Sequence, residues 1–181
     1  AMQSLERAGL VRINHGQRPT VTMPTASGVL AQIELTAMHM LSSSPQSLAQ
    51  LKEARVFFEL GMVARAAEKA TDEDVERLQT LLETQRAQLN VDAGAFIKAD
   101  MSFHVAIAEI TGNAIYIAVS NAMLDWLANF HTSELHWKGN EHITLEEHAR
   151  ILEAIRRRDR DTATDEMRAH LDRAGKRYVL T

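Results

Sequence analysis

Helix-forming sequence runs from Pro24 almost to the end of the chain and is interrupted only by short breaks. Apolar side chains recur there at the three- and four-residue spacing of an amphipathic helix, and residues that favour helix, such as Ala, Leu and Glu, are frequent. The segments predicted as helices are 26–43, 47–69, 71–90, 92–110, 114–131, 143–158 and 162–179, with 132–141 as a loop or lid. The pattern predicts an all-α antiparallel bundle of six or seven helices.

The composition restricts the class of protein. A chain of 181 residues, 45% of them hydrophobic, is long enough for one domain with its own core. It has no cysteine, which excludes disulfides and thiolate ligands for zinc. No apolar run approaches the roughly 18 residues that cross a bilayer, and no signal peptide is visible. We therefore expect a soluble, cytoplasmic protein.

Charge is distributed unevenly along the chain. Residues 1–24 carry three arginines and one glutamate, whereas the remainder holds 17 basic and 23 acidic residues, a balance of −6. Nucleic-acid backbones are bound by clustered Lys and Arg. The acidic body is therefore a poor candidate for non-specific DNA binding. The small N-terminal segment differs from it because its net charge is positive.

The N-terminal segment has the pattern of a helix followed by a two-stranded ribbon. Residues 1–8 favour helix and stop at Gly9, and two short strands, 10–13 and 20–23, flank a turn at 14–17. An isolated hairpin is at best marginally stable. We interpret the segment as the end of a winged-helix DNA-binding domain whose earlier helices lie outside this sequence. The alternative is a hairpin that packs on the helical body.

Three histidines and one aspartate form a candidate metal site. Asp100 and His104 share one helical face because they lie four residues apart. His148 and His170 are equidistant from Asp159, which lies in the charged connector between the last two predicted helices. If these helices fold back on each other, the two imidazoles come level, and the set of four suits a transition metal, most readily Zn²⁺. Taken alone, the Asp100–His104 pair is equally compatible with a hydrogen-bonded pair at the surface. His148 and His170, taken singly, are more typical of solvated or capping histidines than of ligands.

Arg55 lies among apolar side chains in the segment 51–59 and therefore needs a partner. One interpretation is an ion pair with Glu59, four residues later on the same helix. The other is a clamp for a carboxylate ligand, because the planar guanidinium matches a carboxylate with two parallel hydrogen bonds. The sequence leaves both open.

Several segments resemble a known family. The run Leu5-Glu6-Arg7-Ala8-Gly9-Leu10-Val11, with the Gly-containing turn after it, resembles the end of the winged helix-turn-helix of GntR-type regulators. The body resembles the FadR-type C-terminal ligand-sensing domain, called FCD. The segments that carry this second resemblance are Arg55-Val56-Phe57-Phe58-Glu59, Ala66-Ala67-Glu68, Asp100-Met101-Ser102-Phe103-His104, Gly112-Asn113, Glu147-His148 and His170-Leu171. Within the family, the sialic-acid regulators are the members that this chain most resembles. The segments that carry this likeness are 96–98, 108–113 and 124–127.

The resemblance implies a function. It implies a transcription regulator, expected to be a repressor and not an enzyme, that binds operator DNA as a homodimer. Residues 1–24 would be the remnant of the DNA-binding domain, and 25–181 the metal-dependent effector-binding and dimerisation domain. The effector would be a small carboxylate, with sialic acid and other acid sugars as candidates. The residues implied are Asp100, His104, His148 and His170 for the metal, Arg55, Glu59 and Asn113 for the effector, and Arg12, His15, Gly16 and Arg18 for DNA.

Two other functions remain open from the residues alone. Three His and one Asp can hold zinc with open positions that activate water, as in a metallohydrolase acting on a small carboxylate substrate. Such an enzyme also needs a general base, for which Glu147 and Glu109 are conceivable, although neither lies in a His-Glu-x-x-His motif. The third function is a dimerisation module in which the metal is only structural.

Overall fold

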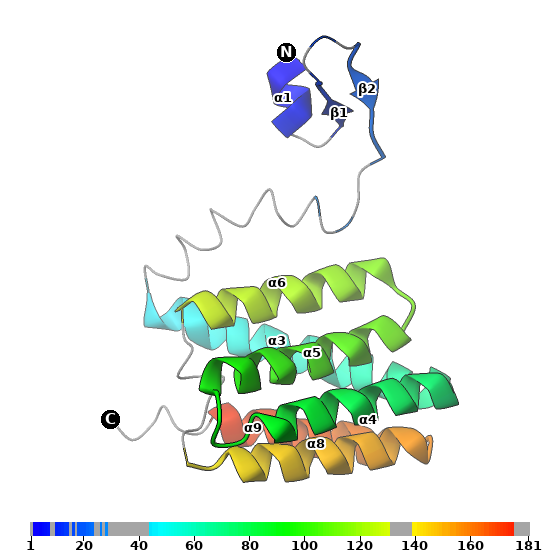
Figure 1. The fold of residues 1–181 in the computed structure, drawn as a ribbon, viewed down its shortest axis with the longest axis vertical. Helices are drawn as coiled ribbons and strands as arrows, with labels where there is room; N and C mark the ends of the chain where they lie inside the picture. Colours follow the sequence, from blue (N-terminus) through cyan, green and yellow to red (C-terminus); the bar gives the residue numbers. More distant parts are fainter. Residues whose placement is uncertain are drawn as a thin grey trace.

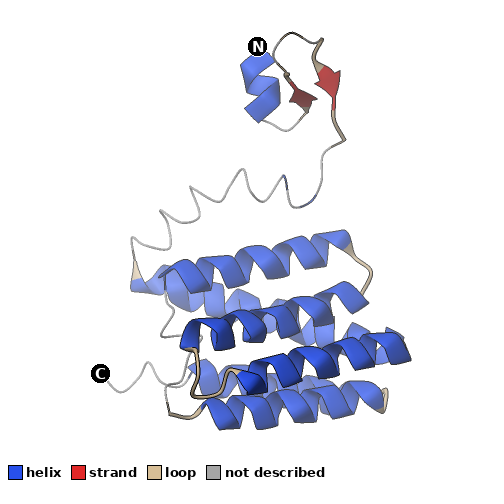
Figure 2. Ribbon diagram, viewed as in Figure 1, coloured by secondary structure: helices blue, strands red, loops and turns tan. Residues whose placement is uncertain are grey.

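The computed structural model describes residues 2–7, 10–14, 16, 18–23, 26, 28, 44–130 and 139–175. The N-terminal elements are the helix α1 (Met2–Arg7) and the strands β1 (Val11–Arg12) and β2 (Thr20–Val21). The strands pair antiparallel, with Val11 opposite Val21. This order agrees with the helix and ribbon predicted from the sequence, although the strands are shorter than expected (Figure 2).

In the described part of the chain, six helices form the body, and Figure 1 shows how they are arranged. Their bounds are α3 (Pro45–Lys69), α4 (Asp72–Ala87), α5 (Ala93–Ile110), α6 (Ala114–Phe130), α8 (Glu141–Arg156) and α9 (Arg160–Gly175). The predicted all-α antiparallel bundle is therefore confirmed. The helix predicted over 26–43 and most of the loop predicted over 132–141 lie outside the described residues. In the described part of the chain, no helix combines the length and hydropathy needed to cross a membrane.

Capping residues set where the helices begin. Thr71 and Asp74 form a capping box at the start of α4, with each side chain bonded to the backbone N–H of the other residue. Ser44 accepts from the N–H of Gln46, and Pro45 follows in the first helical position, where its missing N–H costs nothing. Asp92 caps α5 by accepting from the N–H of Ala95. These bonds satisfy N–H groups that the first turn of a helix leaves without partners.

The helix ends differ from the sequence prediction by a few residues, for local reasons. Helix α4 ends at Ala87 rather than near Asn90, because Asn90 has a φ of 61° and lies in the turn that leads to α5. Helix α8 ends at Arg156, and Arg158, with a φ of 57°, reverses the chain before α9. The side chain of Asp159 then accepts from the N–H and the hydroxyl of Thr162 at the start of α9.

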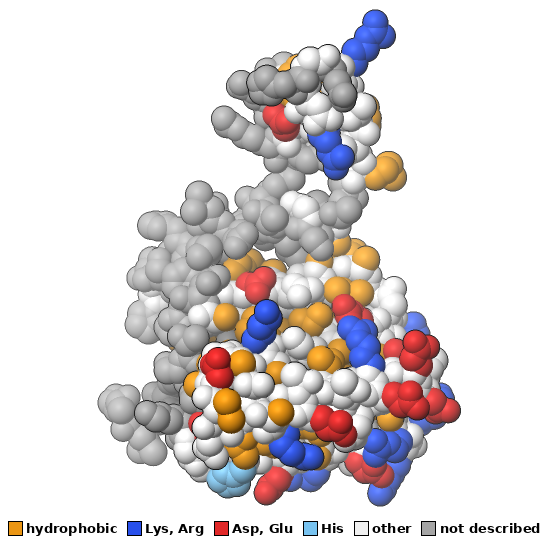
Figure 3. Space-filling view, in the orientation of Figure 1, with side chains coloured by type: hydrophobic (Ala, Val, Ile, Leu, Met, Phe, Trp, Pro, Cys, Tyr) orange, Lys and Arg blue, Asp and Glu red, His pale blue; other side chains and the backbone are white. Residues whose placement is uncertain are grey.

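The bundle is arranged around α3 and α5, and α6 packs across these two helices (Figure 1). Helix α9 packs against α3 and α8, and α4 packs between α5 and α8. The main apolar core lies where these helices meet and includes Val63, Leu78, Phe103, Ile151 and Met167, each completely buried. On the face of the body shown in Figure 3, acidic and basic side chains are interspersed. A group of buried polar side chains, which includes Asp100, His104, His148 and His170, lies inside the bundle.

Candidate metal centre

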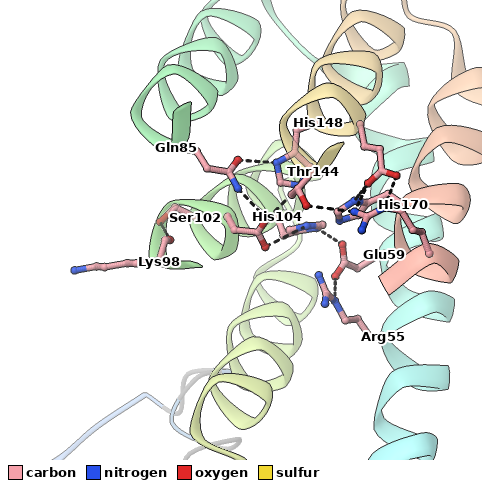
Figure 4. A network of polar contacts seen from close by, with 12 residues as sticks. Arg55, Glu59, Gln85, Lys98, Ser102, His104, Thr144, His148 and His170 are labelled. Carbon is pink, nitrogen blue, oxygen red and sulfur yellow. Dashed lines mark hydrogen bonds and ion pairs between the residues drawn. The ribbon is translucent and has the colours of Figure 1, made fainter. Parts of the chain in front are cut away.

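His104 on α5, His148 on α8 and His170 on α9 meet inside the bundle (Figure 4). One ring nitrogen from each lies within 4.8 Å of those of the other two, and all three residues are buried. The ring centroids of His148 and His170 are 4.8 Å apart. The α8–α9 hairpin therefore brings these two histidines level, as their equal distance from Asp159 predicts.

Asp100 lies beside the histidines, as its spacing from His104 predicts. Its carboxylate oxygens are 3.9 Å from Nε2 of His104 and 3.5 Å from Nε2 of His148. Asp100 is 4% exposed, and Gln85 donates a hydrogen bond to its Oδ1 at 3.0 Å. The structure thus brings together all four residues predicted as metal ligands.

Each histidine is held through its Nδ1 atom by a side chain from another position in the bundle. Nδ1 of His104 bonds Oε2 of Glu59, and Nδ1 of His148 is 2.9 Å from Oε1 of Gln85. Nδ1 of His170 is 2.8 Å from Oε2 of Glu147. Because the three partners are oxygen acceptors, each Nδ1 carries a proton, so Nε2 is the nitrogen of each ring that can offer a lone pair. Metal-binding histidines are commonly oriented in this way by a carboxylate or carbonyl oxygen.

Two of these partners are themselves held by arginines. Nε of Arg55 donates to Oε1 of Glu59 at 2.5 Å, so the ion pair expected between them is present and buried. Nε of Arg173 donates to Oε1 of Glu147 at 2.6 Å, and Arg173 also bonds Oε2 of Glu147. Each glutamate therefore lies between a guanidinium and an imidazole.

Burial and neighbouring charges set the ionisation of the network. Burial alone would raise the pKa of Glu59, but the charge of Arg55 and the contact with His104 hold that pKa far below its ordinary value. Burial would likewise raise the pKa of Glu147, and hydrogen bonds from His170 and Arg173 lower it instead. Burial lowers the pKa of His148 and of His170. Both glutamates are thus anionic and these two histidines neutral at neutral pH.

The donor set fits a divalent transition metal. Nε2 of His104 and Nε2 of His148 are buried polar atoms without a hydrogen-bond partner in the described structure. An unpaired buried polar atom is costly, and two of them facing one carboxylate suggest a group that accepts both lone pairs. Neutral imidazoles with a carboxylate are ligands that zinc and related metals take in proteins.

The other residues predicted for ligand binding lie at different positions. Arg55 and Glu59 belong to the network around His104, and Arg55 is 8% exposed. Asn113 caps α6 by accepting from the N–H of Ile115, and among the described contacts nothing joins it to the histidines. In the N-terminal segment, Arg12, Gly16 and Arg18 are exposed, and Gly16 has a φ of 79° in the turn between the strands. His15 lies outside the described residues.

Several residues of this site have no such role in the sequence prediction. Gln85 and Arg173 are not named there, and Glu147 is named as a conceivable base and as part of a family segment but not as a partner of His170. Phe103, whose ring stacks on His148 with centroids 4.3 Å apart, appears only in a family segment. For Gln85 a signal did exist, because it follows Leu78 and Leu82 at helical spacing on the buried face of α4. A polar residue at a core position requires buried partners.

The comparison with known proteins agrees with this architecture. Residues 50–173 match the FCD domain family over most of the chain, including every residue of the histidine network. The chain belongs to the FCD domain family. The resemblance of the body to the FCD domain is thereby confirmed.

Two curated relatives of this FCD chain are repressors. The HTH-type transcriptional repressor NanR of Cronobacter sakazakii is 39% identical over 95% of this chain and 66% of its own length. NanR of Escherichia coli K12 is 38% identical over 95% of this chain and 65% of its own length. The chain therefore spans about two thirds of the length of these relatives. Both relatives are named as repressors and not as enzymes.

A solved structure shows the same fold. The Streptococcus agalactiae GntR structure superposes with a TM-score of 0.71 at 16% sequence identity. The superposition covers 97% of this chain and 78% of that one. At this identity the likeness shows the fold of the FCD domain and its attached N-terminal elements, and nothing of the ligand.

Proposed function

We propose that this chain is the sensing part of a GntR-type transcriptional repressor of the FadR subfamily, in which the FCD domain binds a divalent metal and a small carboxylate. The observation that carries the proposal is the buried histidine triad, in which every Nδ1 has an oxygen partner and two Nε2 atoms face Asp100 without partners of their own. A purely structural polar cluster would be expected to pair these nitrogens.

Asp100, His104, His148 and His170 would hold the metal, and zinc is the first choice for this donor set. When bound, such a metal supplies a Lewis-acid centre with positions left for ligand oxygens. The ligands come from α5, α8 and α9, and Glu59 and Gln85 bring α3 and α4 into the same network. The state of the site would therefore be transmitted to α3, α4, α5, α8 and α9.

The charges of the network favour a ligand with a single negative charge. Glu59 is neutralised by Arg55, and Glu147 by Arg173, so each of these pairs contributes no net charge. Asp100 offsets one of the two charges of a divalent cation. A monocarboxylate would complete neutrality in this buried site, where an uncompensated charge is costly.

Arg55 is the residue that we propose binds the carboxylate. Within the described residues its guanidinium bonds Glu59 through Nε, which leaves its two terminal amino groups for a ligand. Acid sugars, including sialic acid, are the first candidates, because the relatives are NanR repressors and because the sequence resembles sialic-acid regulators. Glu59 would act by orienting Arg55 and His104, and Asn113 would have only a helix-capping role in this account.

Operator DNA is the proposed partner of the whole protein, which we expect to act as a cytoplasmic homodimer. Residues 1–24, with the exposed Arg12 and Arg18, would belong to the DNA-binding domain, and 25–181 would form the sensing and dimerisation domain. A ligand changes DNA binding only if it binds the two arrangements of the dimer with different affinity. Repressors that act as symmetric dimers contact two half-sites on the DNA.

The site offers little support for hydrolysis. Glu147, the base considered from the sequence, accepts bonds from both His170 and Arg173, and its lowered pKa makes it a weak base. Glu109 pairs with Arg77 at the surface. Neither is free to take a proton from a water molecule near the histidines.

Calorimetric titration tests the proposed function. N-acetylneuraminate, gluconate, glucuronate and lactate are each titrated into the zinc-loaded chain and into the same chain after removal of metal by a chelator. We expect at least one of these monocarboxylates to bind the zinc-loaded chain and to lose that binding after stripping. Equal binding to both forms, or binding of none of the four, would contradict the proposal.

A further inference from the structure

Gln85 differs from the other two partners of the histidines. It is completely buried on α4, and its side-chain amide connects Asp100 to His148, with Nε2 3.0 Å from Oδ1 of Asp100 and Oε1 2.9 Å from Nδ1 of His148. Glu59 and Glu147 are carboxylates, which accept hydrogen bonds at both oxygens. Gln85 instead has one donor end and one acceptor end, so the direction in which the amide points has consequences.

The charge of Asp100 fixes that direction. An ionised carboxylate only accepts hydrogen bonds, so it selects the NH₂ end of the Gln85 amide. The carbonyl end then faces His148 and requires a proton on Nδ1. If the amide were reversed, its oxygen would face the carboxylate of Asp100 with no proton between them, which is unfavourable in a buried site.

We propose that Gln85 is a positioning residue that sets the tautomer of His148, keeping the proton on Nδ1 and the lone pair on Nε2. This role rests on the proposed metal site, since Nε2 is the atom available to a metal. The stacking of Phe103 on His148 holds the plane of the ring but does not distinguish the two tautomers, because both present the same ring face. Among the described contacts of His148, only Gln85 makes that distinction at Nδ1.

A competing arrangement exists when Gln85 is absent. Nε2 of His148 is already 3.5 Å from Oδ1 of Asp100. Without an acceptor at Nδ1, the proton is more favourably placed on Nε2, from which it is donated to Asp100. In that tautomer, Nε2 of His148 carries a proton and donates it in a hydrogen bond to Oδ1 of Asp100. Neither atom is then available to bind a metal. Gln85 thus prevents two ligands of the site from satisfying each other.

The direct test is the tautomer of His148 in the metal-free chain. Long-range ¹H–¹⁵N spectra of protein labelled at histidine, recorded near pH 8, distinguish a proton on Nδ1 from one on Nε2. The signals of His148 are identified by their loss in His148→Gln. We expect the Nδ1–H form in the unsubstituted chain and the Nε2–H form in Gln85→Met, which has a similar shape but no hydrogen-bonding amide. An unchanged tautomer in Gln85→Met would overturn the inference.

Gln88→Met, at the half-buried C-cap that follows α4, is the matched control and should leave the Nδ1–H form in place. If Gln85→Met does not fold, Asp100→Asn tests the same hydrogen bonds from the other side of the Gln85 amide. This substitution keeps the shape of the side chain at position 100. Its amide no longer selects the NH₂ end of Gln85, so a mixture of the two His148 tautomers is expected. A pure Nδ1–H form in Asp100→Asn would contradict the proposed role of Asp100.

Zinc affinity gives a second measurement. Gln85→Met should bind zinc roughly 10–100-fold more weakly than the unsubstituted chain, the usual cost of losing a partner that orients a ligand, and Gln88→Met should not. If the unsubstituted chain binds no zinc, the proposed function fails while the tautomer spectra still report on Gln85. If zinc binds and Gln85→Met changes neither affinity nor tautomer, the inference on Gln85 fails alone.

Discussion

Arg55 and Glu59 form an ion pair inside the bundle, with Nε of Arg55 2.5 Å from Oε1 of Glu59. The second oxygen of the same carboxylate bonds Nδ1 of His104. One glutamate on α3 therefore joins the guanidinium that we propose binds a carboxylate ligand to an imidazole that we propose binds a metal. The proposed ligand-binding residue and the proposed metal-binding residue therefore share this side chain as a partner.

Glu59→Gln should weaken both the fold and the metal site. Removing one partner of a buried ion pair typically costs about 3–5 kcal/mol, and losing a carboxylate that orients a metal ligand lowers metal affinity roughly 10–100-fold. Denaturant unfolding and zinc competition with a chromophoric chelator measure the two effects. Glu68→Gln, in the surface pair with Arg65 on the same helix, is the control and should cost less than about 1 kcal/mol. Effects of equal size in both variants would be inconsistent with the network described.

Arg55→Lys should weaken binding of the carboxylate ligand and leave the metal in place. Lysine keeps the positive charge beside Glu59 but loses the planar pair of donors, at a cost of roughly 1–3 kcal/mol in ligand binding. Calorimetry with the monocarboxylate that binds best, together with elemental analysis, separates the two effects. Arg65→Lys, in an exposed ion pair, should change neither. Equal ligand affinity in Arg55→Lys and the unsubstituted chain would restrict Arg55 to its bond with Glu59.

The metal-free chain should lose stability as the pH falls below about 6.5, the ordinary pKa of histidine. Burial lowers the pKa of His148 and His170 in the folded state. In this range the unfolded chain therefore binds more protons, and stability falls by up to about 1.4 kcal/mol per pH unit for each histidine. The pKa values of Glu59 and Glu147 are also depressed, but their contribution is retained until the pH nears the ordinary glutamate value of about 4.3.

Denaturant unfolding at pH 5 and at pH 7.5 measures this dependence. His142→Gln removes an exposed histidine from α8 and should leave the pH dependence unchanged. A metal-free chain equally stable at both pH values would show that the buried histidines do not resist protonation as their surroundings indicate.

The α8–α9 hairpin and the Asp100–His104 pair were predictable because both depend on local spacing. The i, i+4 rule placed Asp100 beside His104, and the charged connector around Asp159 located the turn that brings His148 level with His170. The partners of the histidines were not predictable in this way. Glu59 and Gln85 lie on helices far away in the sequence, and their pairing depends on how α3 and α4 pack against α5 and α8.

Light scattering should show a homodimer, with twice the 20.2 kDa mass of the chain, because a regulator with two DNA-binding heads requires two copies. Residues 114–126 of α6 are the candidate interface, since this apolar helix packs on α3 and α5 and still exposes Ile115 at 62%. Ile115→Asp should weaken the dimer. Val91→Asp, at a 76% exposed position between α4 and α5, should not. A monomer at micromolar concentration would argue against this assembly.

The metal content of the purified chain, compared with that of His170→Ala, tests the central claim most directly. His170 is 4% exposed, and Glu147 holds its Nδ1, so we propose that the other ring nitrogen is a metal ligand. Elemental analysis should find about one divalent metal per protomer, most of it zinc, in the unsubstituted chain. His170→Ala should lose most of that metal. Losing a residue that only orients a ligand lowers metal affinity roughly 10–100-fold, and losing the ligand itself lowers it further. The same metal content in both proteins, or no metal in either after zinc is supplied, would contradict the account.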